Sequence, residues 1–248
     1  MGKGGASVET EHPFRARLRM QIGSRVRWIS HLEYLRMMTR TLRRSKLPIM
    51  YSEGFNPHVR IAFAHARPVG LSSDGEYADV MLFEQIPIDE VKARLDEVLP
   101  AGFVVLEAHY VAPSGPGLSS VLNAGRYQFE FVADPEDISP WTEGLERLQR
   151  ETELPVIRHR HRKPPRSLNL APHVYNVQVE ASESTDLRSI VAELATGSQF
   201  NIRPHEFLEV LIPFLPKTGE REAPTCLRVH RLDLFALIDG QRRTAWDL

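Results

Sequence analysis

The sequence predicts an α+β protein with two tandem ferredoxin-like (βαββαβ) domains and mainly antiparallel sheets. Segments with the period-2 alternation of strands and the 3.6-residue spacing of helices follow one another in the order β-α-β-β-α-β, and this order occurs twice. A stretch rich in Pro, Gly and Ser, residues 112–117, separates the two rounds. A chain of 248 residues, 42% of them hydrophobic, can bury a sizeable core and divide into two units.

The same observations set the expected boundaries. We expect a disordered tail over residues 1–12, a first domain over residues 13–112, a linker over residues 113–122 and a second domain over residues 123–248. The first domain carries a basic helix and a polar loop. The second carries a basic segment over residues 158–166.

The first domain begins with a strand over residues 14–22. Apolar residues alternate there with Arg15, Arg17 and Arg19, which is typical of a strand with one buried face. We expect the three arginines to lie on the outward face. Further strands are predicted over residues 59–66, 76–84 and 103–111, with a helix over 87–99.

A basic helix follows the first strand. Ser30 and Glu33 have the spacing of a capping box, which predicts that the helix starts there, and Pro48 lies beyond its end. Its expected inward stripe consists of Leu32, Leu35, Thr39 and Leu42. Its other flank carries Arg36, Arg40, Arg43 and Arg44.

A shaped loop is predicted over residues 52–58, which read SEGFNPH. Gly54 and Asn56 tolerate positive φ, and Pro57 fixes its own φ, so a regular strand is excluded there.

The second domain is predicted from similar patterns. Strands are expected over residues 126–133, 154–160, 175–181 and 207–212, helices over 135–150 and 186–196, and an extra strand over 228–237. Tyr175, Val177 and Val179 are expected to face inward.

Composition excludes several classes of protein. The 31 basic and 32 acidic residues nearly cancel, so any attraction to nucleic acid has to come from local clusters. The single cysteine, Cys226, excludes an internal disulfide and fits a reducing cytoplasm. There is no apolar run of membrane-spanning length, no secretion signal pattern, no nucleotide-binding glycine motif and no iron–sulfur cysteine cluster. We therefore expect a cytoplasmic protein without cofactor or metal.

The basic helix is the first candidate binding site. Residues 30–46 contain five Lys or Arg residues against the single acid Glu33, so the helix cannot neutralise its own charge. Arginine forks on one face suit phosphate binding, and a solvated helix exterior is the alternative. The RNA-binding residues expected here and in the following loop are Arg36, Arg40, Arg43, Arg44, Lys46, Ser52, Asn56, His58 and Arg60.

The second candidate binding site is the segment over residues 158–166. If the segment is extended, its basic residues can follow a nucleic-acid backbone. The expected contacts are Arg158, Arg160, Arg162, Lys163 and Arg166. A metal site at His159 and His161 and a surface loop without function are the alternatives, and the lone His-x-His is a weak metal signature.

Four residues are weak candidates for acid–base catalysis: His31, His58, Glu76 and Asp79. Nothing in the sequence fixes their mutual geometry. The alternative for His31, which adjoins the helix cap, is a purely structural role. The alternative for Glu76 and Asp79 is ion pairing with arginines.

Several motifs together resemble the radical SAM-linked protein family, a bacterial family of uncharacterised domains. The similar stretches are residues 30–36, 40–44, 47–48, 51–58, 68–70, 76–79 and 203–208, and the basic strand before Leu168-Asn169-Leu170. The match covers about residues 13 to 240. One departure is Asn169, where the family pattern leads us to expect aspartate. Family members that are fused behind a radical SAM enzyme imply a module that presents a substrate to such an enzyme.

We therefore expect an accessory module that binds RNA, tRNA or rRNA, for an RNA-modifying radical SAM protein. One alternative is a metal-independent RNA-processing or RNA-modifying enzyme that uses His31 or His58 with the 52–58 loop. A second alternative is an adaptor whose basic helix docks on an acidic protein partner.

Overall fold

The computed structural model describes residues 13–132, 138–160, 162–180, 187–217 and 223–248. The expected tail over residues 1–12 lies outside the described residues, as do the first residues of the helix expected from residue 135.

The first half of the chain forms the predicted strands and helices. They are β1 (Phe14–Ile22), α1 (His31–Arg44), β2 (Ile61–Phe63), β3 (Ser72–Leu82), α2 (Ile88–Val98) and β4 (Phe103–Val111), with a 3-10 helix at Ser24–Val26. The longest helix, α1, has 14 residues. No helix in the described ranges has both the length and the apolar character that crossing a membrane requires.

The second half begins after the short helix α3 (Leu118–Val121). Its strands are β5 (Ala124–Val132), β6 (Pro155–Arg160), β7 (Lys163–Asn169), β8 (Val174–Glu180), β9 (Leu187–Ala195), β10 (Cys226–Ile238) and β11 (Gln241–Arg243). Its helices are α4 (Ser139–Arg150), α5 (Pro204–Leu211) and the 3-10 helices Ala171–His173 and Ile212–Phe214.

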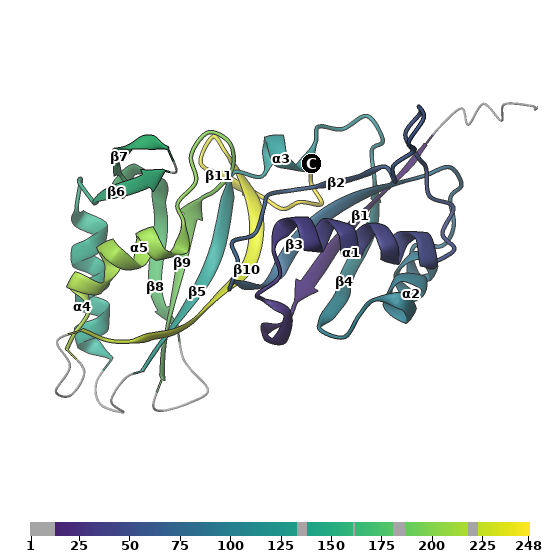
Figure 1. Ribbon diagram of the computed structural model, residues 1–248. Coiled ribbons are helices and arrows are strands. Elements are labelled where there is room, and N and C mark those ends of the chain that lie inside the picture. The colour runs from purple at the N-terminus through teal and green to yellow at the C-terminus, as the bar shows by residue number, and fades with distance from the viewer. Residues whose placement is uncertain (1–12, 133–137, 161, 181–186, 218–222) are drawn as a thin grey trace, which may run out of the picture.

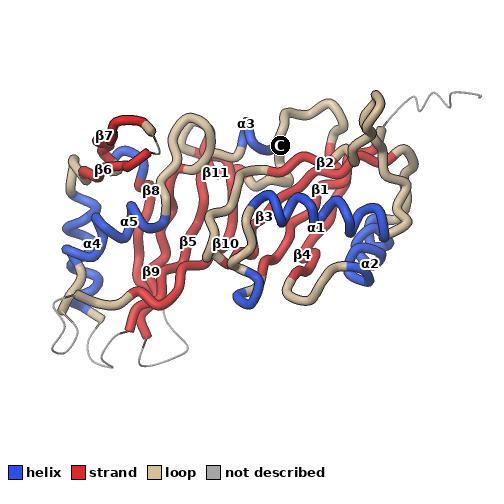
Figure 2. Tube along the Cα trace, viewed as in Figure 1, coloured by secondary structure: helices blue, strands red, loops and turns tan. Residues whose placement is uncertain are grey.

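One sheet of nine strands runs through the described part of the chain (Figures 1 and 2). Its main path has the order β4-β1-β3-β10-β5-β9-β8, with β2 paired to β3 and β11 paired to β10. Every pair is antiparallel except β3 with β10, which run parallel over a short register. The predicted fold class, α+β with mainly antiparallel strands, is confirmed.

The strand order contains the ferredoxin-like arrangement twice. Both β4-β1-β3-β2 and β10-β5-β9-β8 have the order fourth, first, third, second of a βαββαβ unit. Right-handed crossovers, together with the parallel β3–β10 contact, place the helices of both units on the same face of the sheet. In Figure 1, α1 and α5 both lie in front of it. The β6–β7 hairpin is inserted between α4 and β8.

Two element predictions in the second half are wrong. Residues 187–195 form strand β9 instead of a helix, and residues 204–211 form helix α5 instead of a strand. The apolar residues of segment 187–195 have helical spacing. The segment nevertheless lies between β5 and β8 and is almost completely buried, and a strand that is buried on both faces is apolar at most positions. Residues 228–237 belong to β10, which is the fourth strand of its unit and no extra strand.

The inward stripe of α1 differs from the predicted one. The buried residues are Tyr34, Met38, Thr41 and Leu42, whereas Leu32 is 54% exposed. The Tyr34 ring packs edge-on against Phe63, with ring centroids 5.3 Å apart. The helix is therefore rotated from the predicted orientation. In the second half, Tyr175 is exposed as well, and its inward prediction is wrong.

The arginine side of β1 is also covered, contrary to the prediction. Arg15 and Arg17 are buried, and both donate to the Asp79 carboxylate on β3, with Nε–Oδ distances of 2.7 and 2.8 Å. Arg15 also donates to carbonyl groups of residues 112–116, and Arg17 donates to those of Ala245 and Leu248. The Pro/Gly-rich stretch and the segment after β11 therefore cover this side of the sheet.

Candidate nucleic-acid interface

The four arginines of α1 are exposed to solvent. No described residue forms an ion pair or hydrogen bond with the guanidinium of Arg36, Arg40, Arg43 or Arg44. The one acid of the helix, Glu33, is used by the capping box, in which it accepts from the Ser30 amide at 2.7 Å. Hydrogen bonds from Ser30 hold the pKa of Glu33 below its usual range. The helix thus presents uncompensated positive charge.

Three of these arginines line one hollow. It has a volume of about 380 Å³ and lies between α1 and the end of α2. Its lining consists of Arg36, Arg40 and Arg44 together with Glu33, Met37, Thr41, Val98 and Pro100. Residues four apart lie on successive turns, about 6 Å apart along the axis. A row of guanidinium groups at this spacing can hold several anionic oxygens together.

Lys46 extends the charge past the end of the helix. Its φ of 57° is left-handed, which stops the helix and turns the chain toward Pro48. Its carbonyl accepts from Arg94 Nη1 on α2 at 2.8 Å, while its side chain remains exposed. We call Arg36, Arg40, Arg43, Arg44 and Lys46 the arginine face.

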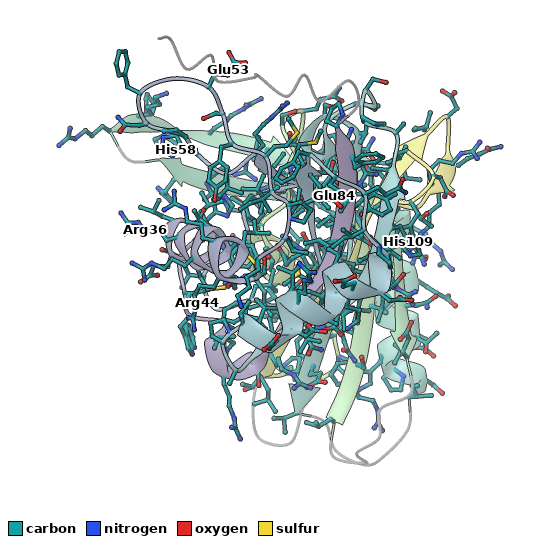
Figure 3. All side chains as sticks on the ribbon, turned by 90° about the vertical axis from the view of Figure 1, so that its right-hand side faces the viewer. Arg36, Arg44, Glu53, His58, Glu84 and His109 are labelled. Atoms are coloured by element: carbon teal, nitrogen blue, oxygen red, sulfur yellow. The ribbon has the colours of Figure 1, made fainter. Side chains whose placement is uncertain are left out.

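The 52–58 loop is closed at its base. The Ser52 amide donates to the His58 carbonyl at 2.8 Å, and the His58 amide donates to Ser52 Oγ at 3.0 Å. Asn56, His58 and Arg60 are exposed, and Ser52 is half-buried. Figure 3 shows His58 on the same side of the molecule as Arg36 and Arg44. Of the predicted loop residues, His58 thus lies on the side of the arginine face (Figure 3).

The β6–β7 hairpin presents part of the second predicted cluster. Arg162, Lys163 and Arg166 are exposed there. Arg158 is engaged: it donates to both carboxylate oxygens of Glu206 at 2.5 Å and to the Asn201 carbonyl at 2.6 Å. Of Arg160 only the backbone is described, and His161 lies outside the described residues, so the alternative of a metal site at His159 and His161 is not tested.

Glu206 anchors this hairpin to α5. Burial raises the pKa of Glu206, but hydrogen bonds from Arg158 and the Arg203 amide, together with the two positive charges, outweigh burial and lower it. The carboxylate is thus ionised at neutral pH. Arg158 therefore holds the hairpin in place, and its role as an RNA contact stays a prediction.

The candidate acid–base residues do not form one site. Glu76 pairs with Arg231 at 2.8 Å, and Asp79 pairs with Arg15 and Arg17. Positions 76 and 79 point to opposite faces of β3. His31 packs edge-on against Phe63, and His58 is exposed on the loop. Among the described residues, no group of His, Cys, Asp and Glu that could hold a metal ion occurs.

Asn169 has a structural role that suits an amide. Its Oδ1 accepts from the amides of Leu154 and Ala171 at 2.8 and 3.1 Å, and its Nδ2 donates to the Thr152 carbonyl at 2.9 Å. A carboxylate could accept the first two hydrogen bonds but could not donate the third.

Comparison with known proteins identifies the family. A family profile described as "Uncharacterized protein conserved in bacteria (DUF2344)" matches residues 15–204. The chain belongs to this family. The matched range contains both the basic helix and the β6–β7 hairpin, but the family description names neither an activity nor a radical SAM enzyme.

Other comparisons with this DUF2344 chain add little. No curated protein matches it. Among solved structures, a chain of "Crystal Structure of a Cbf5-Nop10-Gar1 Complex" is similar with a TM-score of 0.42 and 11% identity over 88% of the present chain. The match covers 48% of that chain, so the DUF2344 protein spans about half its length. We draw no functional argument from a likeness of this size.

One exposed residue of the DUF2344 chain was missed by sequence reasoning. Phe55, at the tip of the 52–58 loop, has a relative exposure of 106%. A large apolar residue between Gly54 and Asn56 in an otherwise polar loop is the signal that could have identified it. The loop therefore presents an aromatic ring as well as polar groups.

Proposed function

We propose that this protein binds structured RNA, tRNA or rRNA, through the arginine face and the 52–58 loop, with the β6–β7 hairpin as a second contact. The observation that carries the proposal is the row of exposed, unpaired arginines around one hollow on α1. Guanidinium forks bond phosphate oxygens in pairs and release counterions, which gives affinity that falls with salt.

Comparison with the other helices favours phosphate binding over a merely solvated exterior. On α2, Lys92 pairs with Asp96 at 2.6 Å and Arg94 pairs with Glu90. On α4, Arg150 pairs with Glu146 at 3.2 Å. These helices pair basic residues with acids one turn away, whereas α1 has one acid, Glu33, for its four arginines, and no ion pair between them is described. In a chain with a formal charge of -1, this concentration of charge is a local feature.

The proposed role is accessory to an RNA-modifying radical SAM enzyme. This part of the proposal rests on the sequence resemblance alone. The chain has a single cysteine, so it lacks a cysteine set for an iron–sulfur cluster of its own. The dispersed positions of His31, His58, Glu76 and Asp79 favour a binding module over the alternative of an RNA-processing enzyme.

A matched pair of double variants tests RNA binding. Arg40 and Arg43 lie three residues apart near the end of α1, and Arg147 and Arg150 have the same spacing at the end of α4. We expect R40Q/R43Q to reduce the slope of log K against log salt for a transcribed tRNA by about 1.4 to 1.8, because two phosphate contacts are lost. The control R147Q/R150Q removes the same charge and should keep the wild-type slope.

Equal slopes for wild type and R40Q/R43Q, with circular dichroism showing an intact fold, would exclude the arginine face as the RNA site. Retained RNA affinity combined with lost binding to an acidic protein would support the adaptor alternative.

A further inference from the structure

We infer that Phe55 is a base-stacking residue and that the RNA bound by this protein exposes an unpaired nucleotide to the 52–58 loop. The inference rests on the proposed RNA-binding function and names the kind of RNA that the same site takes.

The loop holds its backbone while leaving the ring free. Two hydrogen bonds between Ser52 and His58 close the base, and Tyr51 forms a bridge with Val59. At the tip, Phe55 is fully exposed. A ring held out in water on a closed loop gains no packing energy within its own chain, so both of its faces remain available to stack on a partner.

The base of the loop is fixed to β3, an inner strand of the sheet. The Met50 amide donates to the Met81 carbonyl at 2.8 Å, and the Met81 amide donates to the Arg60 carbonyl at 3.0 Å. Val59 is buried beneath the loop. The arm that carries Phe55 is therefore anchored to β3, and less ordering entropy is lost when a ligand binds a preformed arm.

The neighbouring side chains fit a nucleotide. His58 and Arg60 are exposed close to the ring in sequence and offer donors to flanking phosphates. Glu53 is exposed on the same loop, where its carboxylate would repel a phosphate but can accept from the amino group of a base edge. An aromatic ring flanked by cations is the common arrangement for single-stranded nucleic acid, since every base has a face that can stack.

Pairing state distinguishes this contact from the arginine face. Phosphates are available on paired and unpaired RNA alike, whereas the faces of bases inside a duplex are already stacked on each other. Phe55 should therefore act only where a base is unpaired, while Arg40 and Arg43 should act on both forms.

Three substitutions at Phe55 test the inference. The probes are a single-stranded oligoribonucleotide and the same strand annealed to its complement, each at fixed salt. We expect Phe55→Ala to weaken single-strand binding about 5- to 150-fold and to leave duplex binding within about twofold. Phe55→Trp should retain single-strand affinity, and its fluorescence should be quenched on binding. Phe55→Leu should lose single-strand affinity as Phe55→Ala does, because leucine keeps apolar surface but has no π face.

The outcomes separate the two proposals. One outcome is that Phe55→Ala leaves single-strand affinity unchanged while R40Q/R43Q still reduces the slope of log K against log salt. In that case stacking by Phe55 is excluded, and RNA binding by α1 is retained. If Phe55→Leu binds like wild type, the ring makes only apolar contact, as in a protein pocket, and the inference is overturned. If the wild-type protein binds neither probe, both proposals fail.

Discussion

Asp79 shows how a single side chain organises the back of the first unit. Its carboxylate holds Arg15 and Arg17, and all three residues are at most 5% exposed. Charges in such a place are stable only as a paired set with their hydrogen bonds satisfied. The carboxylate is therefore a structural group, as the pairing alternative from the sequence expects.

Removal of the Asp79 carboxylate should strongly destabilise the folded protein. We expect Asp79→Ala to lower the free energy of unfolding by about 3–5 kcal/mol, because two buried guanidinium groups lose their counter-charge. Urea denaturation measures the change. The control is Glu107→Ala, which removes the half-exposed partner of Arg19 and should cost less than about 1 kcal/mol. Equal effects of the two substitutions would contradict the structural role of Asp79.

At the scale of residues, local sequence predicts local features only. The capping box at Ser30 and the exposure of Arg36 follow from spacing and charge within one helix, and both are found. Arg17 and Arg158 have partners 62 and 48 positions away, so nothing in their neighbourhood indicates burial or an ion pair. The exposed cluster was predictable for this reason, and the engaged arginines were not.

At the scale of elements, periodicity misassigned one strand and one helix. Leu187, Ile190 and Leu194 have helical spacing, but a central strand is apolar on both faces and can match the same pattern. In α5, Pro204 at the first position and Glu206 in the first turn are helix-start signals that were overlooked. The order β-α-β-β-α-β was obtained with a different set of strands, because residues 154–160 were counted as its second strand but form β6 of the separate β6–β7 hairpin.

The attachment of the β6–β7 hairpin should depend on pH. Because the pKa of Glu206 is lower in the folded protein than its ordinary value of 4.5, its ion pair with Arg158 adds stability above that pH. The contribution should disappear as the pH falls through the lower folded value. We expect Glu206→Gln to cost roughly 3 kcal/mol in urea denaturation at pH 7, and we expect this difference from wild type to shrink as the pH falls below 4.5.

The control for this prediction is Glu146→Gln, which breaks an exposed pair within α4. It should cost less than about 1 kcal/mol at pH 7 and show no comparable convergence. A pH-independent difference between Glu206→Gln and wild type would refute the assignment of the lowered pKa to Glu206.

At the scale of the whole molecule, the junction between β3 and β10 joins the two units. The parallel register is short, His230 with Ser72 and Arg231 with Ser73. Side chains reinforce it: Glu76 pairs with Arg231, and Tyr77 donates to Asp233 at 2.7 Å. The sheet is thus continuous, and the division into domains at residues 113–122 stays a prediction.

A glycine permits the close approach at this junction. A Cβ on Gly75 would lie 2.5 Å from the Asp233 Cα. We expect Gly75→Ala to push β10 from β3 and to lower the free energy of unfolding by about 1–3 kcal/mol, measured by thermal or urea denaturation. At Gly117, by contrast, an added Cβ meets no atom within 4 Å and φ is -70°, so Gly117→Ala should be neutral or slightly stabilising. Wild-type stability of Gly75→Ala would contradict the described packing.

We propose that RNA binds along the arginine face and the 52–58 loop. Its most direct test is ultraviolet crosslinking of the tagged protein in its native cells, with sequencing of the attached RNA and mapping of the crosslinked peptides. We expect one dominant tRNA or rRNA species, crosslinked to peptides within residues 36–60 and, as a second site, 162–166. No RNA above background, or crosslinks confined to other surfaces, would contradict it.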